Sequence, residues 1–317
     1  MTDIKRLGLG CMGMNMSNME RSVETVRYAL DHGVRLLNTG EFYGGGESEM
    51  VLREALQGVP RENYFISVKF GMLPQPGGGM YGIDVKPWNV KGHLAYSLHR
   101  LGLDYVDLYE PARIDESIPV EEIVGAVQEC VDAGYVRHIG LTELSADKLE
   151  RAAKAYPIHT AELSYGLSNR SIENNGILDT ARSHGIGVLA FAVLSHGLLS
   201  ENTSVAAFRK GMPDEMKNKL LAGIREIAAD KGTTVEKLLQ AYVWCKNPDM
   251  SILIGTTRKE HLQDSIDALQ VDLTDEDIRN MEKAFPTEMH GGMGMRNFTF
   301  RDGKFEGGQR LHQAQKE

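Results

Sequence analysis

Short apolar runs alternate with longer amphipathic segments along the whole chain. Short runs of this kind are typical of buried strands, and the segments between them carry apolar residues at helical spacing. The pattern predicts eight strands, at residues 7–9, 34–38, 64–69, 105–109, 138–141, 160–163, 187–191 and 251–254.

Several of the amphipathic segments carry clear helix signals. A glycine or a proline marks where a helix stops or starts, and a serine just before the first turn can accept a hydrogen bond from it. We expect helices at residues 21–30, ending at Gly33, at residues 120–127, beginning after Pro119 and running to Gly134, and at residues 146–155, capped by Ser145.

Eight strands that alternate with helices, without an interdomain linker, predict an α/β fold with one domain over residues 1–317. A (β/α)8 TIM barrel fits this order better than an open, doubly wound sheet. The glycines in residues 7–13 look like a phosphate-binding turn, but their spacing is wrong and no helix opens there. We therefore reject a dinucleotide-binding fingerprint at this position.

Two segments look irregular, at residues 70–81 and 286–317. The first follows a predicted strand end, on the face where barrel active sites form. Both segments are compatible with disorder, yet their methionine and aromatic residues suggest packing over something apolar. We expect them to be flexible walls of a substrate pocket, with the C-terminal tail covering it at the C-terminal face of the barrel.

Composition argues against several kinds of partner and site. The net charge of −9 leaves no basic stripe for nucleic acid. Cys11, Cys130 and Cys245 lie far apart without metal-ligand spacing, so we expect no metal site and no disulfide framework, as in a reducing cytoplasm. The first residues lack a signal peptide's apolar region, and no run approaches the roughly 18 apolar residues of a membrane span. We expect a cytoplasmic monomer or weak homo-oligomer that acts on a small molecule.

The most informative chemistry lies at two predicted strand ends. Tyr43 follows the second strand and precedes a glycine-rich turn, and Lys69 ends the third strand. A tyrosine beside a lysine can donate a proton to a carbonyl oxygen, because the lysine charge favours the phenolate and lowers the tyrosine pKa from about 10. On spacing alone, a core tyrosine and a solvated lysine are the favoured explanation of this pair.

Five segments, in this order along the chain, resemble the aldo-keto reductase superfamily. Residues 38–44 resemble its Asp-Thr-Ala-x-x-Tyr-Gly segment, and residues 67–71 resemble its lysine strand. Residues 136–143 resemble its fifth strand, whose end holds the nicotinamide amide. Phe191 stands where an aromatic ring stacks on the nicotinamide. Residues 254–262 resemble the turn that binds adenosine and its 2′-phosphate.

The resemblance implies an NADPH-dependent barrel that reduces aldehydes and ketones, with no metal. It implies Tyr43 as the proton donor, Lys69 as its partner and Asn38 beside the lysine. The residues that it places at the cofactor are Met12, Thr142, Glu143, Glu162, Phe191, Leu194, Ser195, Gly197, Gly255, Thr256, Thr257, Arg258, His261, Asp264 and Ser265. The residues that it places at the substrate are Phe42, Phe70, Glu110 and Ala112.

Two positions depart from the family pattern. Asn38 replaces the usual aspartate, so it can hydrogen-bond Lys69 but supplies no counter-charge. Ala112 replaces the histidine that orients the carbonyl, and an alanine can neither donate a hydrogen bond nor transfer a proton. The incomplete tetrad leaves two interpretations open: a working reductase, or an NADPH-binding sensor or regulatory homologue with little turnover. Retention of Tyr43 and Lys69 favours the enzyme.

The departures also indicate a branch of the superfamily. Residues 38–43, 110–113 and 171–177 resemble the microbial pyridoxal reductases and their relatives. The candidate reaction is therefore the reduction of an aldehyde or ketone to the alcohol, with pyridoxal to pyridoxine as the candidate substrate and product.

Several of these positions also have an ordinary structural explanation. The Arg258 guanidinium matches the geometry of phosphate oxygens. Without the family resemblance, however, a helix cap with a solvated arginine is the favoured explanation of Thr256, Thr257 and Arg258. Phe191 is compatible with the barrel core, and Asn38 with the cap of a strand-end turn.

Overall fold

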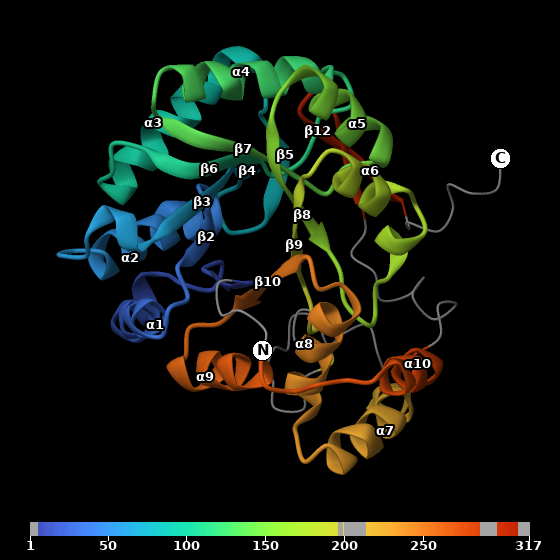
Figure 1. The fold of residues 1–317 in the computed structure, drawn as a ribbon. Helices are drawn as coiled ribbons and strands as arrows, with labels where there is room; N and C mark the ends of the chain where they lie inside the picture. The colour runs from blue at the N-terminus through green and yellow to red at the C-terminus, as the bar shows by residue number, and fades with distance from the viewer. Residues whose placement is uncertain (1–5, 196–198, 200–213, 286–296, 310–317) are drawn as a thin grey trace.

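Eight parallel strands close into a barrel at the centre of the molecule (Figure 1). The structure is a computed structural model that describes residues 6–195, 199, 214–285 and 297–309. The strand order around the barrel is β1-β10-β9-β8-β7-β6-β3-β2. All eight predicted strands are confirmed, with ends displaced by at most two residues. The barrel strands are β1 (Leu7–Gly10), β2 (Leu36–Gly40), β3 (Phe65–Phe70), β6 (Val106–Pro111), β7 (Val136–Thr142), β8 (Ile158–Ser164), β9 (Gly187–Phe191) and β10 (Met250–Gly255).

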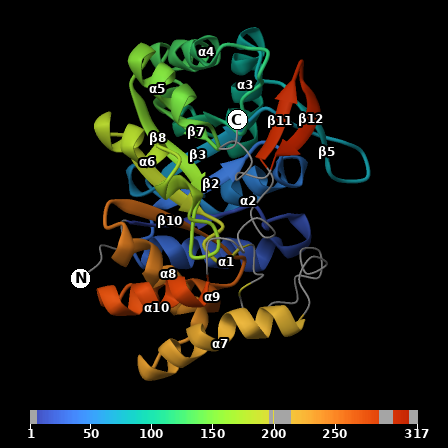
Figure 2. The same cartoon turned by 90° about the vertical axis from the view of Figure 1, so that its right-hand side faces the viewer.

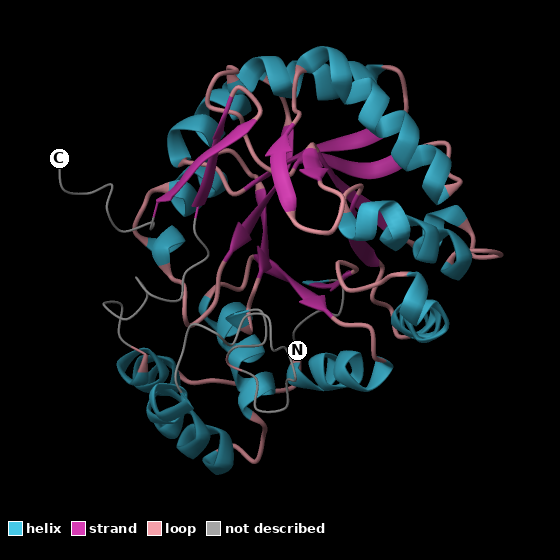
Figure 3. Cartoon of the chain, turned by 180° about the vertical axis from the view of Figure 1, so that it is seen from behind, coloured by secondary structure: helices cyan, strands magenta, loops and turns pink. Residues whose placement is uncertain are grey.

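Helices surround the barrel (Figure 3). Helix α5 has the predicted bounds, and the Ser145 hydroxyl accepts a hydrogen bond from the backbone N–H of Lys148. None of the helices in the described part of the chain is long and apolar enough to cross a membrane. The helices are α1 (Met19–Asp31), α2 (Glu47–Ala55), α3 (Val90–Leu101), α4 (Val120–Asp132), α5 (Ala146–Ala155), α6 (Ile177–Ser183), α7 (Asp214–Asp230), α8 (Val235–Lys246), α9 (Lys259–Ala268) and α10 (Asp275–Ala284).

Strand β3 shows how the fold separates apolar from polar residues. Successive side chains of a strand point to opposite faces of the sheet. Phe70 is fully buried and stacks on Tyr109, 4.4 Å away between ring centroids, and its ring lies 6.0 Å from that of His93 on α3. Phe70 therefore faces the helices, and Ser67 and Lys69 face the barrel interior.

A small antiparallel sheet lies beside the barrel and joins two distant parts of the chain (Figure 2). Its strand order is β11-β12-β5-β4. The expectation of irregular structure is wrong for residues 72–74 and 80–81 and for the described part of the tail, because each segment finds strand partners there. The rest of residues 286–317 lies outside the described chain. The strands are β4 (Met72–Pro74), β5 (Met80–Ile83), β11 (Asn297–Arg301) and β12 (Lys304–Gln309).

Asp115 holds the turn of the β11–β12 hairpin against the loop that follows β6. Its carboxylate accepts hydrogen bonds from the backbone N–H groups of Asp302 at 3.1 Å and Gly303 at 2.6 Å. Burial raises the pKa of Asp115. The hydrogen bonds from Ser117, Gly303 and Asp302 lower it, and together they outweigh burial, so the pKa lies below its usual value. The hairpin is therefore anchored at the C-terminal end of the barrel, where β6 ends.

Candidate active site

Tyr43 and Lys69 meet at the C-terminal ends of β2 and β3. Tyr43 opens a short helical turn, η3 (Tyr43–Gly46), directly after β2. Gly44 and Gly45 adopt φ angles of 61° and 65°, the left-handed region that favours glycine, so the chain can turn back at once toward α2. The Lys69 Nζ atom lies 5.4 Å from the centroid of the Tyr43 ring. The structure therefore brings together the two residues on which the proposed chemistry depends.

Below Tyr43, five polar residues form a connected network inside the barrel, which we name the interior polar cluster. Counted over the whole residue, backbone included, each of them is at most 4% exposed. Buried polar groups are stable only when they are hydrogen-bonded, and this network satisfies most of its atoms internally. The interior polar cluster consists of Asn38 on β2, Ser67 and Lys69 on β3, Glu110 on β6 and Glu162 on β8.

Asn38 is the centre of this network. Its Nδ2 atom donates to Glu162 Oε2 at 2.7 Å and to Ser67 Oγ at 3.0 Å. Its Oδ1 atom accepts a hydrogen bond from Lys69 Nζ. The expected contact between Asn38 and Lys69 is therefore present, and all of it is carried by an amide that bears no charge.

The counter-charge for Lys69 comes from Glu162. Lys69 Nζ lies 3.1 Å from Glu162 Oε1, and both side chains are 5% exposed. Burial is the largest single influence and would lower the pKa of Lys69. The negative charge of Glu162, smaller contributions from Tyr43 and Glu110, and the hydrogen bond to Glu162 together outweigh it, so the pKa of Lys69 is raised. The resemblance places Glu162 at the cofactor, whereas here its carboxylate binds the lysine.

Glu110 is the second carboxyl group of the interior polar cluster. Its Oε1 atom accepts a hydrogen bond from Ser67 Oγ at 2.8 Å, and its Oε2 atom is buried without a hydrogen-bond donor among the described residues. Burial, together with the negative charge of Glu162, raises the pKa of Glu110 well above the usual range. Gly140 on β7 makes room for this side chain, because a Cβ atom there would lie 2.5 Å from Glu110 Oε2.

The pKa of Tyr43 corrects one expectation. We expect Lys69 to lower it, and the lysine charge does act in that direction. Burial of the hydroxyl acts more strongly in the opposite direction, so the net pKa of Tyr43 is raised above 10. The positive charge of Arg113 also lowers this pKa, by less than Lys69 does.

Of the residues expected at the substrate, Phe42 lies beside the site, whereas Phe70 lies on the other face of its strand. The Phe42 ring lies edge-on to Tyr43, 4.8 Å away between centroids, and it is half-buried beside the site. Ala112 is buried at the C-terminal end of β6. Phe70 is a correction: it packs on the outer side of β3, because Lys69 beside it points inward, and so it cannot line the site.

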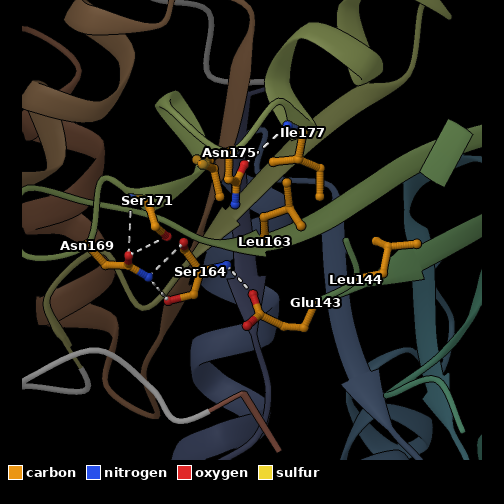
Figure 4. A pocket seen from close by; sticks show the side chains of 9 residues that line it. Glu143, Leu144, Leu163, Ser164, Asn169, Ser171, Asn175 and Ile177 are labelled. Carbon is orange, nitrogen blue, oxygen red and sulfur yellow. Dashed lines mark hydrogen bonds between the residues drawn. The ribbon is translucent and has the colours of Figure 1, made fainter. Parts of the chain in front are cut away.

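Glu143 and its neighbours form a small pocket at the ends of β7 and β8 (Figure 4). The Glu143 carboxylate accepts a hydrogen bond from the backbone N–H of Ser164. Burial raises the pKa of Glu143 against the lowering effect of the Arg113 charge. The hydroxyl of Thr142 donates to the carbonyl oxygens of Pro111 at 3.0 Å and Ala112 at 2.6 Å, so it ties β7 to β6. The pocket is lined by Glu143, Leu144, Leu163, Ser164, Asn169, Ser171, Ile172, Asn175 and Ile177.

Unusual backbone conformations gather at the same end of the barrel. Glu143, Ala192 and Ser195 have φ angles of 44°, 57° and 49°. Such angles are costly for residues other than glycine and cluster at functional sites. Phe191 ends β9 half-buried, and Leu194 lies on the turn that follows. Gly197, expected at the cofactor, lies outside the described residues.

The turn from β10 into α9 carries several of the residues expected at the cofactor. Some of them have no side-chain partner among the described residues, and others are already engaged in contacts within the chain. Arg258 is the N-cap of α9, and its guanidinium is exposed without a side-chain hydrogen bond or ion pair in the described chain. Ser265 is buried, and its hydroxyl donates to the His261 carbonyl at 3.0 Å. Asp264 pairs with Lys237 at 3.2 Å. Asp264 is nevertheless exposed, and the other exposed or half-exposed residues expected here are Met12, Gly255, Thr256, Thr257, Arg258 and His261.

Sequence reasoning missed three contributors to the site. Ser67 and Arg113 were not expected there, and Glu162 was expected to have another partner. For Ser67 a signal did exist, because it lies two residues before Lys69 on a strand and must share its face. Glu162 lies 93 positions from Lys69, so no local spacing points to their contact.

The closed barrel and the tyrosine–lysine pair at its C-terminal end define the class as a (β/α)8 reductase-type barrel. The family model described as "Aldo/keto reductase family" matches residues 6–285, and the chain belongs to this family of oxidoreductases.

Three similar proteins illustrate the relationship. The chain is 31% identical over 301 residues to "Probable aldo-keto reductase 1" of Glycine max, covering 90% of this chain and 86% of that one. It is 29% identical over 300 residues to "Aldo-keto reductase yakc [NADP(+)]" of Schizosaccharomyces pombe, covering 89% and 88%. The crystal structure of the thermostable aldo-keto reductase Tm1743, in complex with the inhibitor epalrestat, superposes with a TM-score of 0.75 at 27% identity, covering 88% and 94%.

Proposed function

We propose that this chain reduces an aldehyde or ketone to the alcohol with NADPH, and that Tyr43 is the proton donor. The observation that carries the proposal is the contact between Tyr43 and a buried, ionised Lys69 at adjacent strand ends. Membership of the aldo/keto reductase family and the NADP(+) in the name of the fission yeast relative support the cofactor. The intact ion pair of Lys69 favours a working enzyme over a cofactor-binding sensor.

The residues of the site divide the chemistry among them. NADPH, when bound, supplies the hydride. Tyr43 donates its phenolic proton to the carbonyl oxygen of the substrate as negative charge develops there, and the raised pKa keeps this proton in place until then. Lys69 stabilises the phenolate that remains through its positive charge, and solvent returns the proton afterwards.

The turn before α9 fits the 2′-phosphate of the cofactor. Arg258 is exposed and has no side-chain partner in the described chain, and the first backbone amides of α9 favour an anion. A guanidinium binds phosphate oxygens through two parallel hydrogen bonds. We therefore assign Arg258 to this phosphate; the comparison of NADPH and NADH affinities in Arg258→Ala measures its contribution.

The substrate class follows from Ala112. A methyl group cannot donate a hydrogen bond to the carbonyl, so a simple aldehyde is aligned and polarised by Tyr43 alone. An aromatic aldehyde with a hydroxyl in the ortho position, as in pyridoxal, supplies a second hydrogen bond to its own carbonyl oxygen. We propose that ortho-hydroxy aromatic aldehydes, with pyridoxal among them, are the preferred substrates.

An assay of two matched aldehydes tests this function. Salicylaldehyde should give a kcat/KM roughly ten- to a hundredfold above that of 2-methoxybenzaldehyde, the effect of one hydrogen bond in a dry site. Ala112→His should reduce this ratio by improving the methoxy compound. Equal ratios in both proteins contradict the substrate class, and no turnover of any aldehyde with NADPH contradicts the enzyme.

A further inference from the structure

We propose that Glu162 is the counter-ion of Lys69, a positioning residue that keeps the ammonium group ionised and directed at Tyr43, and that Glu110 beside it is neutral. The inference rests on the proposed function, because this counter-ion matters to turnover only if Tyr43 is the acid. It assigns Glu162 to the proton-transfer machinery of the site.

The donors of Lys69 are the first argument. An ammonium group has three N–H donors. One is directed to Asn38 Oδ1 and one to Glu162, whose two oxygens lie 3.1 and 3.2 Å from Nζ. Fixing two donors leaves the third for the Tyr43 hydroxyl, and the Tyr43 ring lies 5.4 Å from Nζ.

Charge is the second argument. An ammonium group buried to this extent is stable only if an opposite charge lies close to it. Asn38 carries no charge, and Glu162 forms the buried ion pair with Lys69. Asn38 bridges the pair, because it donates to Glu162 and accepts from Lys69. The family pattern has the counter-charge on β2, at position 38, whereas here it lies on β8, at Glu162. The Asn38 amide on β2 connects Glu162 to Lys69.

The second carboxyl group completes the charge count. Two ionised carboxylates beside one ammonium group in a dry interior would leave an uncompensated negative charge. Glu110 receives one hydrogen bond, from Ser67, and its other oxygen has no donor among the described residues. A protonated carboxyl tolerates that environment, whereas a carboxylate does not. Glu110 therefore carries the proton, and the interior polar cluster is neutral as a whole.

Moving the charge back to β2 tests the inference. Glu162→Gln should lower kcat about ten- to a hundredfold, the range for losing one charge-assisted contact. Asn38→Asp in the Glu162→Gln background restores a carboxylate to Lys69 and should recover at least about tenfold of that loss. Asn38→Asp alone adds a second carboxylate and should give no gain.

The pH profile separates this role from a merely structural one. Without Glu162 the ammonium group loses its main stabilising charge, so the basic limb of the kcat/KM profile should move to lower pH in Glu162→Gln and return in the double variant. NADPH affinity, measured by fluorescence titration, should change little in both. An unmoved limb, an absent rescue, or a loss of NADPH affinity as large as the loss of turnover overturns the inference.

Two further variants keep the test decisive. Asp107→Asn removes a carboxylate from the Arg61 ion pair at the opposite end of β6, and it should leave the basic limb in place. If Glu162→Gln does not fold, Glu162→Asp keeps the charge and should keep the limb at its wild-type position, and a shift there contradicts the inference. Turnover by the unmodified chain, and its loss in Tyr43→Phe, show separately whether the proposed function holds.

Discussion

The two ends of the barrel use charge in opposite ways. At the N-terminal end, Arg61 pairs with Asp107 at 2.6 Å and lies over the ring of Tyr105, 4.1 Å from its centroid. Arg137 covers the same ring at 4.0 Å. At the C-terminal end, Lys69 pairs with Glu162 and has no comparable access to water.

Exposure explains the difference between these ends. The Arg61 and Asp107 side chains are 21% and 14% exposed, so water still solvates them and the pair costs little to form. Lys69 and Glu162 are each 5% exposed, so their desolvation cost is large. Strand β6 contributes to both ends, with Asp107 at one and Glu110 at the other. The partly exposed pair therefore forms at little cost, whereas the buried pair is costly and is explained by the proposed chemistry.

Tyr43→Phe should have the largest effect on activity. It keeps the ring and removes the proton, so kcat should fall by about two to four orders of magnitude, the usual contribution of general acid catalysis. NADPH affinity should stay nearly constant, because the change affects only the transition state. Tyr105→Phe at the opposite end keeps its ring under both arginines and should leave kcat unchanged. Near-normal turnover in Tyr43→Phe would move the proton donor to another group.

Replacing one cation at each end compares their energetic costs. Lys69→Met leaves Glu162 as an unpaired buried charge, so the free energy of unfolding should fall by about 3–5 kcal/mol. Arg61→Met should cost about 1–2 kcal/mol, the sum of a partly exposed ion pair and its stacking on tyrosine rings. Urea denaturation measures both. Adding Glu162→Gln to Lys69→Met should recover part of the loss, and equal costs at the two ends would contradict the comparison.

The smallest expected effect is a change in how stability depends on pH. The folded pKa of Glu110 lies well above its unfolded value of about 4.3. Between the unfolded and the folded pKa of Glu110, the folded chain holds a proton that the unfolded chain has released. The free energy of unfolding therefore falls as pH rises through this range, by up to about 1.4 kcal/mol per pH unit. Glu110→Gln should remove this decline.

Asp115 provides a control with the opposite sign. Its folded pKa is lowered, so its contribution to stability is present above its unfolded pKa and is lost as pH falls through the folded one. Asp115→Asn should therefore reduce stability at neutral pH. It should also weaken the loss of stability that the chain shows as the pH falls into the acid range. Thermal melts across a pH series measure both variants, and an unchanged slope in Glu110→Gln would show that Glu110 is ionised in the folded chain.

The barrel could be predicted from the sequence because its signals are local. Each strand is an apolar run, and Ser145 is the N-cap that marks the start of helix α5. The orientation of Phe70 was also predictable, since Lys69 points inward and neighbours on a strand alternate. The proximity of Tyr43 and Lys69 was predictable as well, because consecutive parallel strands bring their ends together.

The remaining features depend on contacts between distant positions. Glu162 is 124 positions from Asn38, and nothing in the composition of either strand indicates that their side chains meet. The pKa of Tyr43 depends on burial, which spacing does not reveal. Strands β4 and β5 were missed because a strand of the tail extends their sheet.

That pairing has a consequence for the order in which the molecule is made. A ribosome delivers the N-terminal residues first, and β5 emerges long before β12. The small sheet can be completed only after β12 has been synthesised, when the strands that precede Tyr43 and carry Lys69 have already been made. Completion of the small sheet is therefore a late step in biosynthesis, and a chain that stops before β11 would carry Tyr43 and Lys69 without the completed sheet.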